Sequence, residues 1–241
     1  MKISKYLVIA ALLAGTISAQ GAQIYFRGGI DADYTKVGNW LSNDFATVSA
    51  YVPGLDDIAE IHSGVILVTP VISSSAPDVG TLHIGSNSPE GSLIVVDGGS
   101  IDAGTLRVGQ AAIGTLTMTG GLVEGALLNV GYNGGTGIVD MSGNSILHYN
   151  QVDFTLGASG VVNMEDNAKF RVSSISGAAA DALIDNGNIL AANAGAGKFI
   201  EWNWIPTGGY VEYTVIPEPA TLGMVALLGG GLLWIRRRSK V

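Results

Sequence analysis

The chain has 241 residues, enough for one or two domains, and its lack of cysteine excludes both a disulfide framework and a thiolate metal site. Glycine contributes 35 residues and charged residues only 13% of the chain, which indicates tight turns between short strands and excludes a highly charged disordered chain. The segment 23–218 holds six basic residues against all twenty acidic ones, a net charge of −14, so nucleic acid is not expected as a partner.

Residues 1–22 are predicted to be a signal peptide. Lys2 and Lys5 precede an apolar run from Tyr6 to Ala14, and small residues follow up to Ala22. This is the three-part layout of a secretory signal, with cleavage expected between residues 19 and 22. The alternative, an uncleaved anchor, is disfavoured because the apolar run is shorter than the roughly 20 residues that span a bilayer.

Residues 23–78 are predicted to form an N-terminal cap and the first strands. The segment contains Asn39 and Trp40, a Pro53-Gly54 turn, and an alternating strand that follows Asp57. A cap is expected here because the repeats that follow predict a solenoid, and the end of a solenoid exposes strand edges unless it is covered.

Residues 79–172 contain a repeat of about 23 residues. The segment TLHIG (81–85) recurs as TLRVG (105–109), LLNVG (127–131) and DFTLG (153–157), with closing glycines spaced by 24, 22 and 26 residues. The apolar residues of each copy alternate with polar ones, which predicts a strand with one buried face. A glycine-rich or polar turn follows each copy.

A second strand follows each turn and carries its own register. Val96, Met118, Met141 and Met164 are spaced by 22, 23 and 23 residues and are predicted to stack in one interior column. Two strands per repeat and no helix predict an all-β fold, a short right-handed parallel β-helix. The competing architecture is an antiparallel sandwich or barrel, which would show turn signals every 8–12 residues; the longer period favours the solenoid.

Residues 173–216 are predicted to form a degenerate coil or loop followed by C-terminal cap strands. The first part, 173–198, is rich in alanine, glycine and asparagine. Trp202 and Trp204 alternate with polar residues and are expected to cover apolar surface, and residues 210–216 read as a last strand.

The opening NW…P…DD and the TLxxG and GxLxMxGG repeats resemble the passenger regions of β-helical surface proteins. The similarity to autotransporter-associated or pectin-lyase-like repeats covers about residues 36–172. The resemblance implies the solenoid fold and carries almost no information on activity.

No catalytic, cofactor-binding or metal-binding residue is predicted. His62, His83 and His148 lack the spacing of metal ligands and are expected to be solvated. The expected register places Asp97 and Glu165 three coils apart, about 14 Å, whereas glycosidases use carboxylates about 5–9.5 Å apart. Asp140 and Glu165, about one coil apart, are the closer pair. The carboxylates considered are Asp97, Asp102, Asp140, Asp153, Glu165 and Asp166.

Residues 217–241 form a tail in three parts. Pro217, Glu218 and Pro219 come first, an uncharged apolar run covers 220–235, and Arg236, Arg237 and Arg238 follow. The run is predicted to be a transmembrane helix, although its length of about 24 Å is somewhat short of a hydrocarbon core of about 30 Å. The arginines are expected to hold that end in the cytoplasm.

The tail resembles the PEP-CTERM sorting signal of Gram-negative, biofilm-forming bacteria. That resemblance rests on VIPEPATL, the glycine-rich apolar run and the terminal arginine cluster, all in order. It implies that an exosortase, a membrane cysteine transpeptidase, recognises the tail and cleaves near the motif. It also implies a link with exopolysaccharide. The alternative is a plain membrane anchor.

These patterns predict an exported, non-catalytic structural protein of the cell surface or of an exopolysaccharide matrix. It would be held transiently at the inner membrane by its tail and released to the surface by exosortase. The alternatives are a carbohydrate-binding or polysaccharide-cleaving β-helix protein, or an adhesin. Acids and aromatic side chains that converge in a groove from neighbouring coils would favour the carbohydrate-active alternative.

Overall fold

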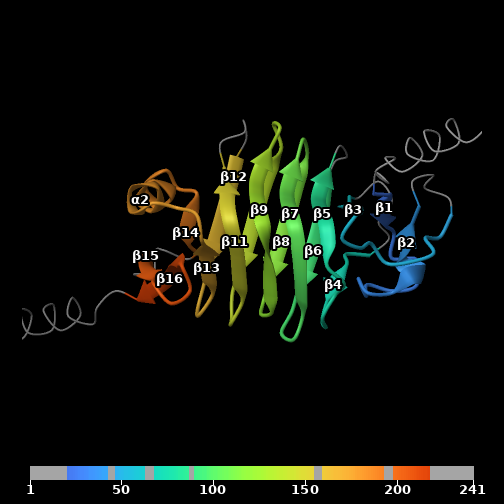
Figure 1. The fold of residues 1–241 in the computed structure, drawn as a ribbon, viewed down its shortest axis with the longest axis horizontal. Coiled ribbons are helices and arrows are strands. Elements are labelled where there is room, and N and C mark those ends of the chain that lie inside the picture. Colours follow the sequence, from blue (N-terminus) through green and yellow to red (C-terminus); the bar gives the residue numbers. More distant parts are fainter. Residues whose placement is uncertain are drawn as a thin grey trace, which may run out of the picture.

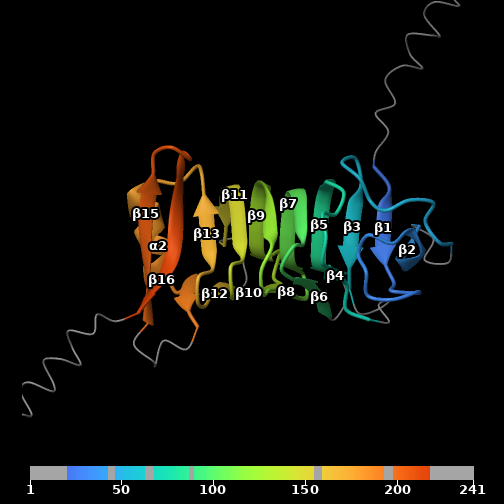
Figure 2. The same ribbon diagram turned by 90° about the horizontal axis from the view of Figure 1, so that it is seen from below.

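Two β-sheets run along the long axis of the molecule, and the chain passes from one to the other and back about once every 23 residues (Figure 1). The computed structural model describes residues 21–42, 47–62, 68–86, 90–154, 159–192 and 198–217. They form an all-β, mostly parallel solenoid of about five turns. The strands follow one another from β1 at one end to β15 and β16 at the other (Figure 2).

The larger sheet, sheet A, has ten strands in the order β15-β16-β13-β11-β9-β7-β5-β3-β1-β2. Neighbours from β1 to β13 are parallel, whereas β2, β15 and β16 are antiparallel to their partners. The strands are β1 (Gln23–Phe26), β2 (Trp40–Leu41), β3 (Ile58–Ile61), β5 (Val79–Ser86), β7 (Ser100–Gln110), β9 (Leu122–Tyr132), β11 (Ile146–Asp153), β13 (Lys169–Val172), β15 (Lys198–Ile205) and β16 (Tyr210–Pro217).

The smaller sheet, sheet B, has six parallel strands in the order β14-β12-β10-β8-β6-β4. Its strands are β4 (Val71–Ile72), β6 (Glu90–Val95), β8 (Ile113–Met118), β10 (Thr136–Met141), β12 (Ser159–Met164) and β14 (Ile189–Ala191). Sequence reasoning therefore predicted the architecture correctly at this level: two parallel strands per repeat, with equivalent residues stacked from coil to coil.

The core consists of apolar columns between the two sheets. Leu82, Leu106 and Leu128 stack in sheet A and are fully buried, as the repeat predicts. The methionine column is correct for Met118, Met141 and Met164, but its fourth member was predicted wrongly. Val95, and not Val96, pairs with Met118 and is fully buried.

The error in the methionine column has a geometric cause. The corner from β8 to β9 is one residue shorter than the corner from β6 to β7, because Ile101 pairs with Val123 while Val95 pairs with Met118. If the corner length of β8–β9 is applied to β6–β7, Val96 falls in the methionine column in place of Val95. The same shift moves Asp97 out of the column that contains Thr119, Ser142 and Glu165, and Val96 takes its place.

Two columns of glycine meet where sheet A turns into sheet B. Gly85, Gly109 and Gly131 close the TLxVG segments with φ between 71° and 78°. A Cβ on Gly109 would lie 2.1 Å from the carbonyl oxygen of Thr136, and a Cβ on Gly114 would lie 2.2 Å from the backbone nitrogen of Gly109. The repeated glycines are thus required because backbone packs directly on backbone at this edge.

The C-terminal end departs from the coil pattern. After β13 the chain forms helix α2 (Gly177–Asp185), whose N-cap Ser176 accepts a hydrogen bond from the backbone of Ala179. A degenerate coil or loop was predicted here, so the helix is a correction; the cap residue and the alanine run favour it locally. Strand β14 then resumes sheet B, and the β15–β16 hairpin closes sheet A.

The predicted tryptophan cover is confirmed in part. Trp202 is half-buried, packs against the core and donates a hydrogen bond to Asp181 on α2 at 2.7 Å, whereas Trp204 stays 50% exposed. At the other end, Trp40 and Tyr34 are fully buried with Phe26, next to the short 3-10 helix η2 (Val37–Asn39). Parallel pairing already begins with β1 and β3, before residue 79.

Candidate functional site

Pro217 is the last residue of β16, where it pairs with Lys198 in the C-terminal hairpin. The remainder of the predicted sorting motif, Glu218 and Pro219, lies outside the described residues. So do the predicted helix 220–235 and the arginines at 236–238, and the signal peptide except for its last two positions. Over the described ranges, no helix is both long and apolar enough to cross a membrane.

Two of the three histidines are buried, so the expectation that they would be solvated is wrong for them. His62 is 8% exposed and His83 is 5% exposed. His62 packs edge-on against Tyr25 with ring centroids 5.6 Å apart, and burial lowers its pKa. His148 is half-buried.

His83 belongs to a polar column on sheet A that sequence reasoning missed. Glu60 pairs with His83, His83 with Arg107, and Arg107 with Asn129 in successive coils. His83 Nδ1 lies 3.3 Å from Glu60 Oε1, and Arg107 Nη1 lies 3.2 Å from His83 Nε2. Because arginine only donates, His83 Nε2 accepts from Arg107, which leaves His83 Nδ1 to donate to Glu60.

Glu60 is the best-connected member of the polar column. Its carboxylate accepts hydrogen bonds from Gln23, His83 and Ser86, and the residue is only 4% exposed. Burial alone would raise its pKa, but the hydrogen bonds that the carboxylate accepts from His83, Gln23 and Ser86 outweigh burial and lower the pKa of Glu60 below 4.5. Every ring or carboxylate in this group is turned toward another residue of the protein, so we assign the column to stability.

A second polar column on the same sheet is more open to solvent. Asp102 pairs with Glu124, Glu124 with His148, His148 with Arg171, and Arg171 with Glu212. Its C-terminal part is held by two ion pairs with Glu212. Arg171 Nε donates to Glu212 Oε2 at 2.8 Å, and Lys169 Nζ lies 3.2 Å from Glu212 Oε1. Its N-terminal part consists of carboxylates.

Asp102, Glu124 and His148 line one hollow on sheet A, together with glycines from three strands or their ends: Gly80, Gly104 and Gly125. Burial and the nearby Asp78 carboxylate raise the pKa of Asp102. Burial and Arg171 lower the pKa of His148, against the opposing effect of Glu124. Two acids therefore come together from neighbouring coils, and among the described residues no phenylalanine, tyrosine or tryptophan lines this hollow. Asp102 was considered from the sequence, whereas its partner Glu124 was not.

The closer pair considered from the sequence, Asp140 and Glu165, does share a hollow on sheet B. Asp140 accepts a hydrogen bond from Asn163 at 2.8 Å. Asp97 and Asp166 lie at exposed corners. In the described part of the chain, no three histidine, aspartate or glutamate side chains are placed to hold a metal ion together.

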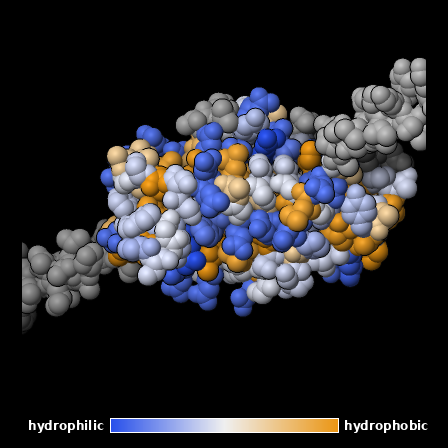
Figure 3. Space-filling view, in the orientation of Figure 1, coloured by the Kyte–Doolittle hydropathy of each residue, from blue (hydrophilic) through white to orange (hydrophobic). Residues whose placement is uncertain are grey.

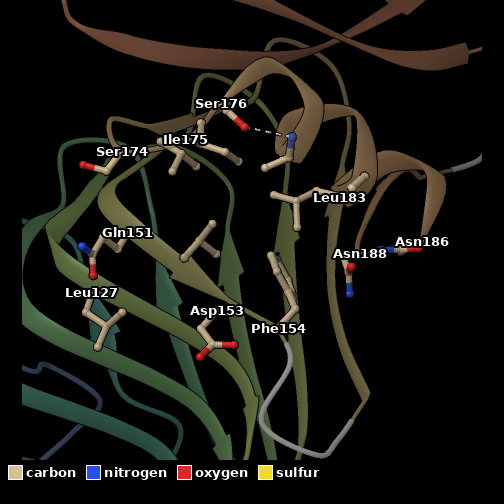
Figure 4. Close-up of a pocket in the computed structure, with 14 residues that line it drawn as sticks. Leu127, Gln151, Asp153, Phe154, Ser174, Ile175, Ser176, Leu183, Asn186 and Asn188 are labelled. Carbon is tan, nitrogen blue, oxygen red and sulfur yellow. Dashed lines mark hydrogen bonds between the residues drawn. The ribbon is translucent and has the colours of Figure 1, made fainter.

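A larger hollow, about 600 Å³, lies between α2 and the end of β11 (Figure 4). Leu183 of α2 and Phe154 after β11 face each other across it, and Gln151 and Asp153 lie at its rim. Its lining is mainly apolar, with amides, hydroxyls and one carboxylate: Leu127, Gln151, Val152, Asp153, Phe154, Val172, Ser174, Ile175, Ser176, Ala179, Ala182, Leu183, Asn186 and Asn188.

On the face shown in Figure 3, hydrophilic residues extend across the central strands. Apolar residues are interspersed among them and do not form one continuous patch. No protein-family model, curated protein or solved structure matches the chain.

Proposed function

We infer that the chain is an exported, non-catalytic structural protein of the cell surface or of an exopolysaccharide matrix. Its C-terminal tail acts as a PEP-CTERM sorting signal, and an exosortase processes that tail. The helix 220–235 and the arginines that follow it hold the exported body at the inner membrane until processing. The solenoid is the part that remains at the surface.

The observation that carries this proposal is the position of the motif relative to the fold. β16 pairs with β13 and β15, and its last paired residue is Pro217. Pro217, the first residue of the motif, is therefore part of the C-terminal hairpin, and Glu218 and Pro219 follow it directly in the chain. Cleavage beyond the motif would leave every described strand of both sheets intact, as a sorting mechanism that delivers a folded body requires.

The structural role is supported by how the polar side chains are used. In the column Glu60–His83–Arg107 they bond to one another, and the network continues from Arg107 to Gln110 and onto the ring of Tyr132. A stack of similar coils whose polar side chains bond mainly to one another is a stiff body suited to a scaffold.

The test is intact-mass spectrometry of the protein from cell fractions of a host with and without its exosortase. We expect a species that has lost its C-terminal tail only where the exosortase is present. Changing Pro217, Glu218 and Pro219 together to alanine should retain the tail, while Glu165→Ala, a matched change away from the motif, should not affect processing. A tail retained in every fraction of the exosortase-containing host would refute the sorting proposal.

A second candidate function, polysaccharide cleavage, is favoured by one observation. Asp102 and Glu124 are directly paired on adjacent parallel strands, which lie about 4.8 Å apart. That spacing is close to the about 5–5.5 Å between the carboxyl groups of retaining glycosidases. The raised pKa of Asp102 would suit a general acid, with Glu124 as the nucleophile.

The enzyme alternative predicts new reducing ends when the purified chain is incubated with the host's exopolysaccharide. Glu124→Gln should then reduce the rate by at least about 100-fold, and Glu165→Gln should leave it unchanged. Absence of reducing ends with the unaltered chain would eliminate this candidate and leave the structural role.

A further inference from the structure

Strand β15 is an open edge at the C-terminal end of sheet A. It pairs with β16 over all eight of its residues, and in the described part of the chain no strand pairs with its other side. Figure 2 shows β15 as the outermost strand of the sheet at this end. Proteins usually cover or charge such an edge, because its unpaired N–H and C=O groups pair readily with another strand.

The main-chain groups on the open side come from alternate residues. In an antiparallel strand the N–H and C=O of one residue point to the same side, and that side alternates along the strand. The carbonyl of Ile205 accepts hydrogen bonds from the two glycines of the hairpin turn, so Ile205 faces β16. Trp204, Trp202 and Ile200 therefore present their N–H and C=O groups at the open edge.

Helix α2 packs on the inner face of the hairpin and leaves the main chain of β15 open. Tyr213 of β16 donates to a carbonyl of α2, and the indole of Trp202 donates to Asp181. Both contacts are made by side chains of the hairpin. Among the described residues, no main-chain hydrogen bond joins α2 to β15.

The opposite end of sheet A offers no matching edge. β2 is only two residues long there, and its outer side is covered, since Leu41 bridges to Val48 and Ser49 donates to the carbonyl of Trp40. Head-to-tail stacking of copies through sheet A therefore lacks a second edge. In another copy of the chain, the edge that β15 can meet is β15 itself, related by a two-fold axis.

The sequence of β15, KFIEWNWI, is self-complementary in one register. When two copies pair antiparallel with the axis at Trp202, each pair over residues 199–205 joins like with like. The pairs are Phe199 with Ile205, Ile200 with Trp204, and Glu201 with Asn203. Moving the axis to Glu201 would place two carboxylates face to face, which is destabilising. Moving it to Asn203 would place Glu201 opposite Ile205.

We propose that two copies of the chain associate through β15, antiparallel and centred on Trp202, so that sheet A continues from one solenoid into the other. Main-chain hydrogen bonds along the edge hold the pair together. The association covers Phe199 and Trp204, which are 44% and 50% exposed in a single copy. Two symmetric contacts between Glu201 and Asn203 fix the register. The association is separate from the sorting of the tail, so either proposal can fail without the other.

The absence of cysteine from the chain allows a direct test of the register by cross-linking. Glu201→Cys and Asn203→Cys are introduced separately into the full-length chain, purified in detergent, and oxidised alone or as a mixture. Directly paired residues have Cβ atoms about 4.5–5.5 Å apart and diagonal ones about 7–8 Å, whereas a disulfide needs about 3.5–4.5 Å. We therefore expect at least about fivefold more disulfide dimer from the mixture than from either variant alone.

The other outcomes of the cross-linking contradict the proposal. Equal yields from all three samples would mean random collision. A dimer that forms best from Glu201→Cys alone, or from Asn203→Cys alone, would mean that the axis lies at that residue and that the complementarity of the strand does not set the register.

Sedimentation of the full-length chain in detergent measures the dissociation constant of the dimer, in about 0.15 M salt to screen the net negative charge. Asn203→Glu places like charges at both symmetric contacts and should raise the constant at least about threefold. Glu201→Lys combined with Asn203→Glu should restore association, because opposite charges then face each other. That rescue also shows that Asn203→Glu leaves the fold intact.

The apolar contacts are tested by Trp204→Ser, which should weaken association at least about tenfold. The matched control is Leu55→Ser, at a position that is 69% exposed and far from β15 in the sheet order, which should leave association unchanged. Equal association by Trp204→Ser, no rescue by the charge-reversed pair, or a chain that stays monomeric up to about 1 mM would overturn the proposal.

Discussion

Alanine at position 109 is expected to destabilise the solenoid by about 2–5 kcal/mol. Gly109 has φ 78°, a conformation that costs an L-residue about 1–2 kcal/mol. Its new Cβ would also lie 2.1 Å from the carbonyl oxygen of Thr136. That atom belongs to the backbone of β10, so it cannot rotate away, and such overpacking costs about 1–3 kcal/mol more.

Gly134 provides the matched control, since it has φ 83° and no atom within 4 Å of the position that a Cβ would take. Gly134→Ala should therefore cost only the conformational term, about 1–2 kcal/mol. Urea unfolding at equilibrium measures both. Similar losses for the two variants would mean that the glycine column is needed for its backbone angle and not for close packing.

The same geometry explains why the repeat could be recognised from sequence. Gly85, Gly109 and Gly131 recur because sheet A closes onto sheet B there, so the period of the glycines is the period of the coil. The partner column, Gly91, Gly114, Gly137 and Gly160, lies within the second strands and was not recognised, because glycine inside a strand has no local signal of its purpose.

In the fourth copy of the repeat, the sequence pattern no longer predicts which residues of adjacent strands pair. DFTLG aligns by eye with LLNVG, yet Val152 pairs with Leu128 and Asp153 with Asn129. Phe154 therefore takes the position that follows, two residues earlier than the letters suggest. Corner lengths vary by one or two residues, and each change shifts every later side chain without altering the repeat's appearance.

The polar columns could not be predicted for a related reason. His83, Arg107 and Asn129 occupy one position of the repeat, which the sequence does show, but their types differ. Only the stacking of coils makes His83 and Arg107 hydrogen-bond partners and places Asn129 beside Arg107. The same stacking brings Asp102 beside Glu124, whereas α2 and the hollow beside it depend on where β13 stops.

Replacing Glu60 with leucine is expected to cost about 3 kcal/mol or more. The carboxylate accepts hydrogen bonds from Gln23, His83 and Ser86, and the last two residues are buried. Leucine fills the space but accepts nothing, and each buried donor left without a partner costs about 1–3 kcal/mol. Guanidinium unfolding at pH 7 measures the loss. Glu90→Leu, at the exposed start of β6, should stay within about 0.5 kcal/mol of the unaltered chain.

The contribution of the Glu60 charge should also depend on pH in a defined direction. Because the pKa of Glu60 is lowered below 4.5 in the folded chain, its charge stabilises the fold above the pKa of the unfolded state. That stabilisation is lost as pH falls from about 4.5 through the folded pKa. Glu60→Gln keeps the shape and lacks the titration, so the difference in unfolding free energy between the unaltered chain and this variant should shrink on acidification from pH 7 to pH 3. A difference that grows instead would mean that burial raises the pKa of Glu60 by more than the hydrogen bonds from His83, Gln23 and Ser86 lower it.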